Sequence, residues 1–183
     1  MFTMKIDNDI ELQLFQQHHA NELYWLVDSN RIYLREWLPW VDSMTSPASY
    51  HSIIPLWLNQ FAENKGFNAG IRYKGHLAGS IGLHDIDWRN SQTSIGYYLA
   101  ERAQGKGIMT RSVAAVLNHI FYELGLNRVE IRCGVANTKS RAIPERLHFR
   151  QEGIIREGEN LYGHFHDLIV YSMLAKEWGN RKK

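Results

Sequence analysis

Residues 104–110 read Gln-Gly-Lys-Gly-Ile-Met-Thr, and this stretch decides the fold that we expect. A strand-like run, residues 94–99, precedes it, and a long amphipathic segment follows it. A glycine-bearing loop that opens a helix presents backbone N–H groups without partners inside the helix, and the helix dipole adds to their attraction for anions. Gly105 and Gly107 allow a ligand to approach the backbone, and Lys106 adds a positive charge. The sequence therefore predicts a phosphate or pyrophosphate site here.

Two familiar phosphate-binding loops do not fit this stretch. A Walker loop needs Ser or Thr after Gly-Lys, but Lys106 is followed by Gly107. The dinucleotide fingerprint needs a third glycine, where Met109 and Thr110 stand, and an acidic residue at the end of a second parallel strand. Glu130 falls in the middle of the next predicted strand instead. An ordinary tight turn between a strand and a helix remains the alternative for an isolated Gly-x-Gly.

The composition is typical of one globular domain. A chain of 183 residues can bury one core, so we expect a single domain over residues 1–183 with its core at about residues 10–174. The net charge of +2 gives no argument for nucleic acid as a partner. No apolar run is long enough for a membrane span, and the first residues lack the core of a signal peptide. The single Cys133 fits a reducing compartment, so we expect a cytoplasmic protein.

The order of predicted elements indicates an α/β (α+β) fold. An antiparallel meander comes first, and a crossover helix after residues 104–110 then leads to a further strand. We expect a mixed, mostly antiparallel, twisted sheet of about seven strands flanked by helices. The predicted strands are residues 10–15, 67–73, 77–87, 92–99, 128–133, about 149–157 and 164–174, and the predicted helices are residues 18–30, 31–37, 49–64, 108–124 and about 139–148.

Two motifs carry a resemblance to a known family. Residues 104–109 match the pyrophosphate motif Gln/Arg-x-x-Gly-x-Gly/Ala except at the last position, Met109. Residues 137–149 hold an Asn, a Ser three residues later, a short helix and a Phe, with His148 where the family has glycine and Pro144 inside the helix. On these residues the chain resembles the GNAT superfamily of acyl-CoA-dependent N-acetyltransferases over about residues 10–174. The resemblance implies the GNAT fold and acetyl-CoA as co-substrate.

Within the superfamily the chain is most similar to the Rim-type enzymes that acetylate the N-terminus (alanine) of ribosomal proteins. The similarity lies in Leu-Arg-Glu-Trp-Leu-Pro-Trp at 34–40, Ile-Gly-Tyr-Tyr-Leu at 95–99, Glu-Gly at 152–153 and Asp-Leu-Ile-Val-Tyr at 167–171. It implies acetyl transfer from acetyl-CoA to a primary amine, with a protein N-terminus as acceptor, by direct attack in a ternary complex. A small amine such as a polyamine, an aminoglycoside-like sugar or an amino acid is the first alternative. A CoA-binding regulatory module without turnover is the second.

The resemblance also assigns residues to acetyl-CoA. Residues 104–110 would hold the pyrophosphate through backbone N–H groups, and the strand at 97–99 would pair with the pantetheine arm. A backbone N–H of Tyr98 or Leu99 would stabilise negative charge on the thioester oxygen. Asn137 would bond to the pantetheine amides, although Asn and Ser at this position also cap helices. The expected contacts are Tyr97, Tyr98, Leu99, Gln104, Gly105, Lys106, Gly107, Ile108, Met109, Thr110, Asn137 and Ser140.

Two further residues complete the expected chemistry. Ser140 stands at the family position that donates a proton to the leaving thiolate. Glu159 stands at the position of a carboxylate base in the Rim-type enzymes, and burial or a neighbouring acid would raise its pKa toward neutrality. Glu157, a water chain, or His84 with Asp85 are the alternatives for the base, and Glu157 and Glu159 could both be ordinary solvated charges.

The remaining aromatic and histidine residues are less specific. His164 and His166 lack the helical spacing and acidic partner of a zinc protease, so we expect no metal. Trp37, Trp40 and Trp57 indicate helix packing or an aromatic wall for the acceptor. The expected partners are acetyl-CoA and the acceptor, without nucleic acid or membrane, and a homo-oligomer is left as an alternative.

Overall fold

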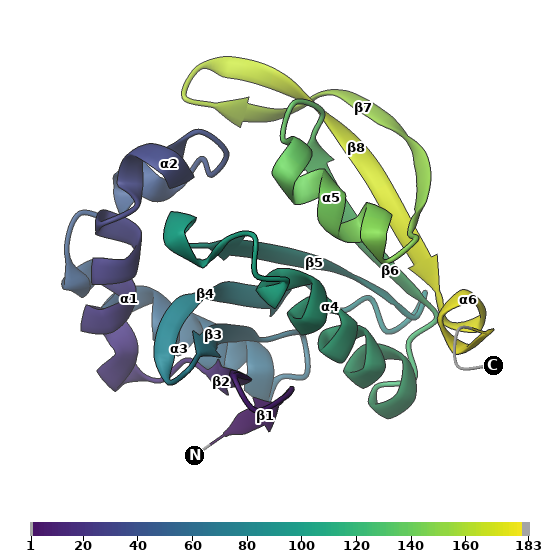
Figure 1. Cartoon of the computed structure of the whole chain (residues 1–183), viewed down its shortest axis with the longest axis horizontal. Coiled ribbons are helices and arrows are strands. Elements are labelled where there is room, and N and C mark those ends of the chain that lie inside the picture. Colours follow the sequence, from purple (N-terminus) through teal and green to yellow (C-terminus); the bar gives the residue numbers. More distant parts are fainter. Residues whose placement is uncertain (1, 181–183) are drawn as a thin grey trace.

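An eight-stranded twisted sheet organises the chain, with the strand order β1-β2-β3-β4-β5-β6-β8-β7 (Figure 1). The structure is a computed structural model, and it describes residues 2–180. The mixed, mostly antiparallel sheet confirms the fold predicted from the sequence. The strands are β1 Thr3–Lys5, β2 Ile10–Leu14, β3 Asn68–Tyr73, β4 His76–Leu83, β5 Gln92–Leu99, β6 Arg128–Gly134, β7 Arg150–Leu161 and β8 His164–Leu174, and the helices are α1 Ala20–Asp28, α2 Arg31–Arg35, α3 Pro47–Ala62, α4 Ile108–Asn118, α5 Thr138–Arg146 and α6 Ala175–Gly179, with short helical turns at η1 Gln17–His19, η2 Val41–Ser43, η3 Glu101–Ala103 and η4 His119–Glu123.

Two elements differ from the expected set. The prediction of about seven strands missed β1, which pairs antiparallel with β2 through only three residues, Thr3 to Lys5. It also missed α6, whose start is held by a hydrogen bond from the Leu174 backbone N–H to Glu177 at 3.0 Å. Both elements lie outside the core range that the sequence indicated, and both are too short to show a hydrophobic period.

The sheet opens in its middle, between β5 and β6. These two strands are parallel, and they pair only at three positions: Gln92 with Arg128, Thr93 with Val129 and Ser94 with Glu130. Beyond them β5 continues to Leu99 and β6 to Gly134 without pairing to each other, and Figure 1 shows the two strands diverging. We call the space between these unpaired segments the gap.

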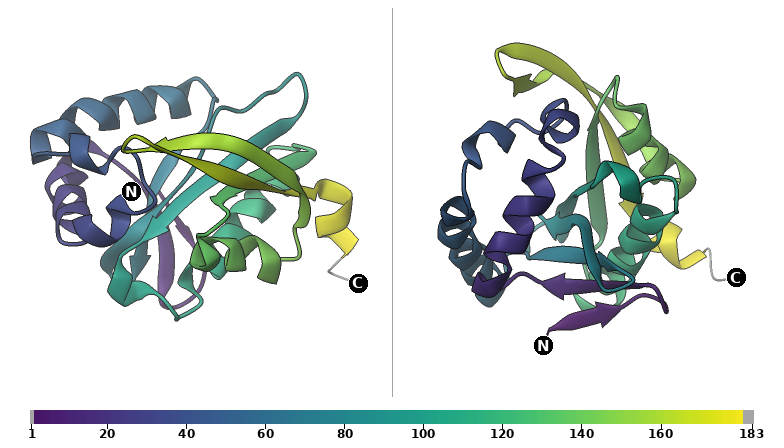
Figure 2. Two further views of the ribbon diagram at one scale, coloured as in Figure 1. Left: turned by 90° about the horizontal axis from the view of Figure 1, so that it is seen from above. Right: turned by 60° about the vertical axis from the view of Figure 1, so that its left-hand side comes forward.

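Helices cover both faces of the sheet. Figure 2 shows α4 and α5 on one face and α1 to α3 on the other. The division follows the alternation of side chains along β4. Ile81 and Leu83 belong to the hydrophobic core beneath α4, whereas Ser80, and His84 just after the strand, lie on the opposite face. A second buried cluster, which includes Leu23, Val27, Tyr50 and Ile54, joins α1 to α3.

A proline inside α3 leaves one helical carbonyl open. Pro55 has no N–H to donate to the carbonyl oxygen of His51, four residues earlier. That oxygen accepts instead from the Gln17 side-chain amide at 3.2 Å, and the other end of the Gln17 amide lies 3.0 Å from Nδ1 of His51. A side chain from η1 therefore compensates for the proline. Within residues 2–180 no helix is long and apolar enough to cross a membrane.

Candidate active site

A cavity of about 1780 Å³ passes through the gap and reaches both faces of the sheet. On one face it is bounded by the loop before α4 and by α5, and on the other by α2, α3 and the segment between α2 and η2. Single-ligand pockets typically hold about 300–1,000 Å³, so this cavity has room for two reactants that meet at the gap. Most of the residues expected to bind acetyl-CoA line it: Tyr97, Tyr98, Leu99, Gln104, Gly105, Gly107, Ile108, Met109, Thr110, Asn137 and Ser140.

The phosphate loop, residues 104–110, presents unpaired backbone amides. Gly105 and Gly107 have φ angles of +72° and +67°, in the left-handed region that favours glycine. The first backbone bond of α4 runs from Arg111 N–H to Gly107 O at 3.2 Å. Within residues 2–180, no acceptor lies against the amides of residues 105–110, and a Cβ at either glycine would meet nothing within 4 Å. The Thr110 hydroxyl is also buried without a partner in that range. These groups suit an anionic ligand.

Side chains around the phosphate loop hold its carbonyl groups rather than its amides. Arg111 donates to the carbonyl oxygens of Lys106 at 3.2 Å and Gly107 at 3.4 Å, and it forms an ion pair with Asp7. The Lys106 ammonium lies 5.5 Å from the centre of the Tyr73 ring and does not line the cavity. The expected positive charge of Lys106 therefore faces away from the loop's amides, and only its backbone remains available to a ligand there.

Asn137 caps α5, which is one of the two roles that the sequence allowed for it, the other being a contact to the pantetheine arm. Its side-chain oxygen accepts from the Ser140 backbone N–H at 3.1 Å, while the same side chain lines the cavity. The Ser140 hydroxyl lies 3.3 Å from the sulfur of Cys133. Burial is the main cause that raises the pKa of Cys133, so this sulfur stays a neutral thiol. The hydroxyl and the thiol both line the cavity at the edge of the gap.

A proline in α5 and a tyrosine in β5 together fix the backbone at Ser140. Pro144 cannot donate to the carbonyl oxygen of Ser140, which would be its helical partner. The Tyr97 hydroxyl donates to that oxygen at 3.0 Å, so a side chain from β5 supplies the missing bond. Burial raises the pKa of Tyr97 well above its usual value, which keeps the phenol protonated as a donor. The carbonyl that Pro144 leaves open, at a position where proline is unusual for the family, is therefore satisfied by Tyr97.

His148 ends α5 in the conformation that glycine usually adopts. Its φ angle is +54°, in the left-handed region, and its backbone N–H donates to the Glu145 carbonyl at 3.0 Å. The following N–H, of Phe149, donates to the Pro144 carbonyl at 2.9 Å. The backbone therefore keeps the turn that the glycine of the family motif would make, at the cost of mild strain.

Backbone alternation decides which amides of β5 face the gap. His84 N–H donates to Ser94 O at 2.9 Å, and Ala100 N–H donates to Ala78 O at 2.8 Å, so even-numbered residues of β5 bond to β4. The amide of Tyr98 therefore belongs to the pairing with β4, and that of Leu99 faces the gap. Of the two donors expected from the sequence, Leu99 is the one placed for a ligand in the gap.

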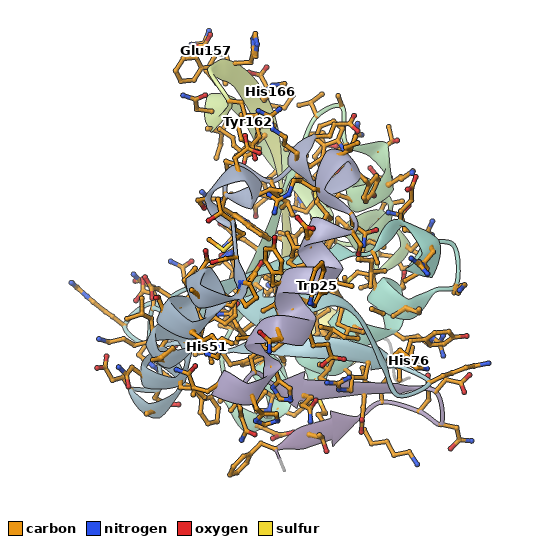
Figure 3. The ribbon with its side chains drawn as sticks, turned by 90° about the vertical axis from the view of Figure 1, so that its left-hand side faces the viewer. Trp25, His51, His76, Glu157, Tyr162 and His166 are labelled. Atoms are coloured by element: carbon orange, nitrogen blue, oxygen red, sulfur yellow. The ribbon has the colours of Figure 1, made fainter. Side chains whose placement is uncertain are left out.

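The carboxylates expected near the amine lie on the β7–β8 hairpin. Glu159 is half-buried and lines the cavity, and burial raises its pKa, while nearby His166 lowers it to a smaller extent. Glu157 is exposed, has a φ angle of +50°, and lies near the outer end of the hairpin, as Figure 3 shows. Its backbone N–H is held by Asp167 at 2.7 Å. Glu159 therefore lies in the cavity, whereas Glu157 lies outside its lining.

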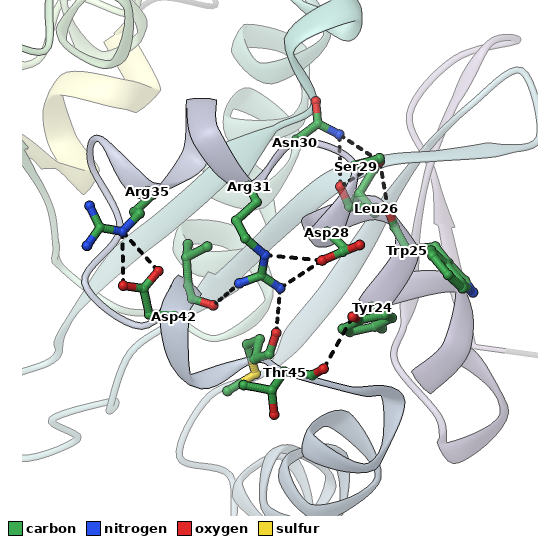
Figure 4. A network of polar contacts seen from close by, with 12 residues as sticks. Tyr24, Trp25, Leu26, Asp28, Ser29, Asn30, Arg31, Arg35, Asp42 and Thr45 are labelled. Carbon is green, nitrogen blue, oxygen red and sulfur yellow. Dashed lines mark hydrogen bonds and ion pairs between the residues drawn. The ribbon is translucent and has the colours of Figure 1, made fainter.

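The aromatic residues expected to form an acceptor wall do line the cavity. Trp37, Trp40 and Trp57 all face it, and the rings of Trp40 and Tyr98 lie 5.5 Å apart. Figure 4 shows a polar network around Arg31, which donates to the carbonyl oxygens of Val41 and Met44, each at 2.6 Å. This network fixes the segment that carries Trp37 and Trp40.

The β7–β8 hairpin reaches the same segment from the other side. The guanidinium of Arg35 lies 3.7 Å from the centre of the Tyr162 ring, and the Tyr162 hydroxyl donates to the Leu38 carbonyl at 2.7 Å. Because Leu38 lies between Trp37 and Pro39, these contacts brace the aromatic wall against the hairpin that carries Glu159.

Several cavity residues escaped the sequence analysis. Arg111, Lys139 and Arg146 place cationic side chains in the lining near the phosphate loop and α5. Tyr33 of α2 spans the two sides: its hydroxyl accepts from the Gln104 amide, and its ring lies 5.3 Å from the Lys139 ammonium. The seven-residue spacing of Lys139 and Arg146 on one helix face could have indicated two of these cations. Tyr33 could not have been found without the tertiary structure.

Comparison with known proteins decides the family. Residues 9–150 match the family model described as an acetyltransferase (GNAT) domain. The chain belongs to the GNAT acetyltransferase family. It is 40% identical over 183 residues to YdaF of Bacillus subtilis (strain 168), provisionally named a ribosomal N-acetyltransferase, with all of both chains covered. GNAT enzymes take the acetyl group from acetyl-CoA, so the chain is an acetyl-CoA-dependent N-acetyltransferase.

Two solved GNAT structures with ligands are closely similar. RimL, a ribosomal alpha-N-protein acetyltransferase in complex with CoA, superposes with a TM-score of 0.92 at 27% identity, covering 96% of this chain and 99% of RimL; its CoA forms a disulfide with a cysteine. The microcin self-immunity acetyltransferase MccE, in complex with acetyl-CoA and AMP, gives a TM-score of 0.89 at 30% identity, covering 93% and 95%. Within residues 2–180, no cluster of three metal-ligating side chains occurs.

A negative charge at Gly107 should abolish CoA binding. In Gly107→Glu the new carboxylate would project from the phosphate loop into the cavity, so we expect the CoA affinity to fall by about a hundredfold or more, measured by calorimetry. Gly107→Ala is the matched control, because it carries the same left-handed strain without charge and should keep the affinity within about tenfold. Equal CoA affinity in Gly107→Glu and wild type would contradict an anion site at this loop.

Removal of the Tyr97 hydroxyl should destabilise the protein. In Tyr97→Phe the Ser140 carbonyl loses its donor, and the free energy of unfolding in urea should drop by about 1–3 kcal/mol. Tyr73→Phe is the control: its ring packs beside two lysines, and within residues 2–180 its hydroxyl has no hydrogen bond, so the change should stay within about 0.5 kcal/mol. If the two variants unfold with the same free energy, Tyr97 does not compensate for Pro144.

Proposed function

We propose that this enzyme acetylates the N-terminal α-amino group of a protein, with a ribosomal protein as the favoured acceptor. The observation that carries the proposal is the continuous cavity from the phosphate loop, through the gap, to an aromatic wall on the opposite face. The similarity to YdaF and to RimL supports a ribosomal acceptor. The acceptor enters from the face of α1 to α3, because α4 and α5 cover the other face.

The charges of the cavity disfavour a polyamine acceptor. Among residues 2–180, Glu159 is the carboxylate in its lining, and Arg132 of β6 places a cation near the gap, while Arg111, Lys139 and Arg146 lie nearer the phosphate loop and α5. A polyamine with several positive charges needs several carboxylates, whereas a protein N-terminus brings one charge to the reacting end. The single carboxylate therefore suits an acceptor with one amine.

Different residues of the chain carry out the separate steps of the proposed reaction. The amides of the phosphate loop hold the pyrophosphate, and Lys139 and Arg146 supply further charge for phosphate groups. The Leu99 amide lies where it can stabilise negative charge on the thioester oxygen. As the nitrogen–carbon bond forms and the carbon–sulfur bond breaks, Glu159 takes a proton from the amine and Ser140 gives one to the sulfur. Solvent water then returns a proton to Ser140 and removes the one on Glu159, so both residues regain their starting state.

The position of Cys133 supports the placement of the sulfur end. Its thiol lies 3.3 Å from the Ser140 hydroxyl, at the edge of the gap. In the RimL structure, CoA forms a disulfide with a cysteine, so a cysteine of that enzyme lies within bonding reach of the CoA sulfur. A similar arrangement here would bring the sulfur of CoA next to Ser140, where proton donation is required.

A comparison of separate acceptors tests the proposed function. The enzyme is incubated with acetyl-CoA and, separately, with peptides that copy ribosomal-protein N-termini, with spermidine and with an aminoacyl adenylate analogue, and free thiol release is measured. We expect kcat/KM for the preferred peptide to exceed that for spermidine by at least about tenfold, because a second ammonium has no carboxylate partner in the cavity. Faster turnover of spermidine, or no turnover of any peptide, would contradict the proposal. Faster turnover of the adenylate analogue would indicate a nucleotide-linked acceptor, in line with the AMP bound in the MccE structure.

The base can be identified from the pH dependence of the rate. Burial raises the pKa of Glu159, and only its deprotonated form accepts a proton, so the rate should fall as the pH drops through this raised pKa. Glu159→Gln should lower kcat and remove this acidic limb. Glu157→Gln, on the same hairpin but outside the cavity, should keep the wild-type profile. An unchanged limb in Glu159→Gln would move the base to another residue or to water.

A further inference from the structure

One face of α2 lies across the open end of the gap. Beyond their three pairs, β5 and β6 run apart toward their carboxyl ends, where the phosphate loop follows β5 and α5 follows β6. Tyr33 and Trp37 come three and seven residues after Asn30, a spacing that puts all three side chains on one face of a helix. The Trp37 N–H donates to the Leu34 carbonyl at 3.1 Å, so the helical turn continues to Trp37. We call the side chains of Asn30, Tyr33 and Trp37 the strap.

The two ends of the strap contact the two strands that border the gap. The side-chain oxygen of Asn30 accepts from the Glu101 backbone N–H at 3.0 Å, two residues after the end of β5. The Trp37 ring lies against Gly134, the last residue of β6, because a Cβ there would lie 3.4 and 3.5 Å from two carbon atoms of the ring. The strap therefore joins the diverging ends of β5 and β6.

The middle of the strap contacts residues that are expected to serve acetyl-CoA. The Tyr33 hydroxyl accepts from the Gln104 amide, and its ring lies 5.3 Å from the Lys139 ammonium. Gln104 begins the phosphate loop and Lys139 lies in the first turn of α5. Tyr33 thus bridges the two elements between which an acyl carrier extends from the phosphate loop into the gap.

The two rings of the strap offer apolar area to a ligand in the gap. Tyr33 and Trp37 are half-buried, and both line the cavity, whereas Asn30 lies outside its lining. The pantetheine arm of CoA combines methyl and methylene groups with two amides. The unpaired edge of β5 supplies hydrogen-bond partners for amides, and the aromatic rings supply contact for the apolar groups. The strap and β5 are therefore complementary surfaces for this arm.

We propose that Tyr33 and Trp37 are positioning residues that close the open end of the gap over the pantetheine arm. The inference rests on the placement of acetyl-CoA under the proposed function, and it holds for any amine acceptor. With the strap closed, the thioester stays at the Leu99 amide and water is kept from its carbonyl carbon. With the strap open, the oxygen of water bonds to that carbon and the carbon–sulfur bond breaks. One proton of that water passes to the sulfur, so acetic acid and the free thiol form.

The ratio of acetyl-CoA hydrolysis to acetyl transfer tests the strap. We would measure free thiol and acetylated product together, with whichever amine turns over fastest in the comparison of acceptors. Tyr33→Ala and Trp37→Ala should each raise this ratio by about tenfold over wild type. Tyr33→Phe keeps the ring and should stay within about threefold. Unfolded protein catalyses neither reaction, so a purely structural role would leave the ratio unchanged.

Two further variants separate the strap from general effects on α1 and α2. Trp25→Ala is the matched control, because it removes an aromatic ring that is 62% exposed on α1 and should keep the wild-type ratio (Figure 3). Asn30→Ala removes the bond to Glu101 without changing the cavity lining. It should loosen the strap and raise the ratio by about threefold.

Acetyl-CoA without an amine gives a second measurement. Hydrolysis by Tyr33→Ala should then exceed that by wild type by about tenfold. Equal ratios in wild type, Tyr33→Ala and Trp37→Ala, or equal hydrolysis without an amine, would overturn the strap and leave the proposed function intact. Faster hydrolysis in Tyr33→Ala with no acetylation of any peptide would support the strap and overturn the proposed acceptor.

Discussion

The structure depends on the loss of pairing between β5 and β6 after three residue pairs. Backbone N–H and C=O groups in a sheet normally bond to the next strand, and groups left without a partner inside a protein are costly. Here the edges of β5 beyond Ser94 and of β6 beyond Glu130 face a cavity instead of one another. These open edges lie where the cavity connects the two faces of the sheet, which is where the proposed reaction brings the two reactants together.

Side chains rather than backbone hold the two halves of the opened sheet in place. Tyr97 of β5 bonds to the Ser140 carbonyl of α5, and Tyr162 of the β7–β8 hairpin bonds to the Leu38 carbonyl after α2. In both α3 and α5, a proline leaves a carbonyl open, and a side chain from another element takes it. The bond from Tyr97 keeps Ser140 of α5 beside Cys133 of β6 at the edge of the gap.

The sequence was most informative where a period or a turn fixes the backbone. The apolar face of α4, the hairpins of β3 to β5 and the two glycines of the phosphate loop follow from spacing alone. The sequence could not predict the directions of side chains. Lys106 is adjacent to both glycines, yet its ammonium lies over the Tyr73 ring. The positions of Asn68 and His84 were equally hidden, because the register of β3, β4 and β5 places the Asn68 amide beside Gly82 and the His84 ring beside Gly96.

Residue-resolved amide hydrogen exchange, with and without CoA, tests the central claim most directly. If the phosphate loop and the edge of β5 wait for a ligand, the amides of Gly105, Gly107 and Leu99 should exchange quickly in the free protein and become protected when CoA binds. The amide of Tyr98, bonded to β4, should be protected in both states. Protection of Gly107 and Leu99 without CoA, or no change when CoA is bound, would contradict the account.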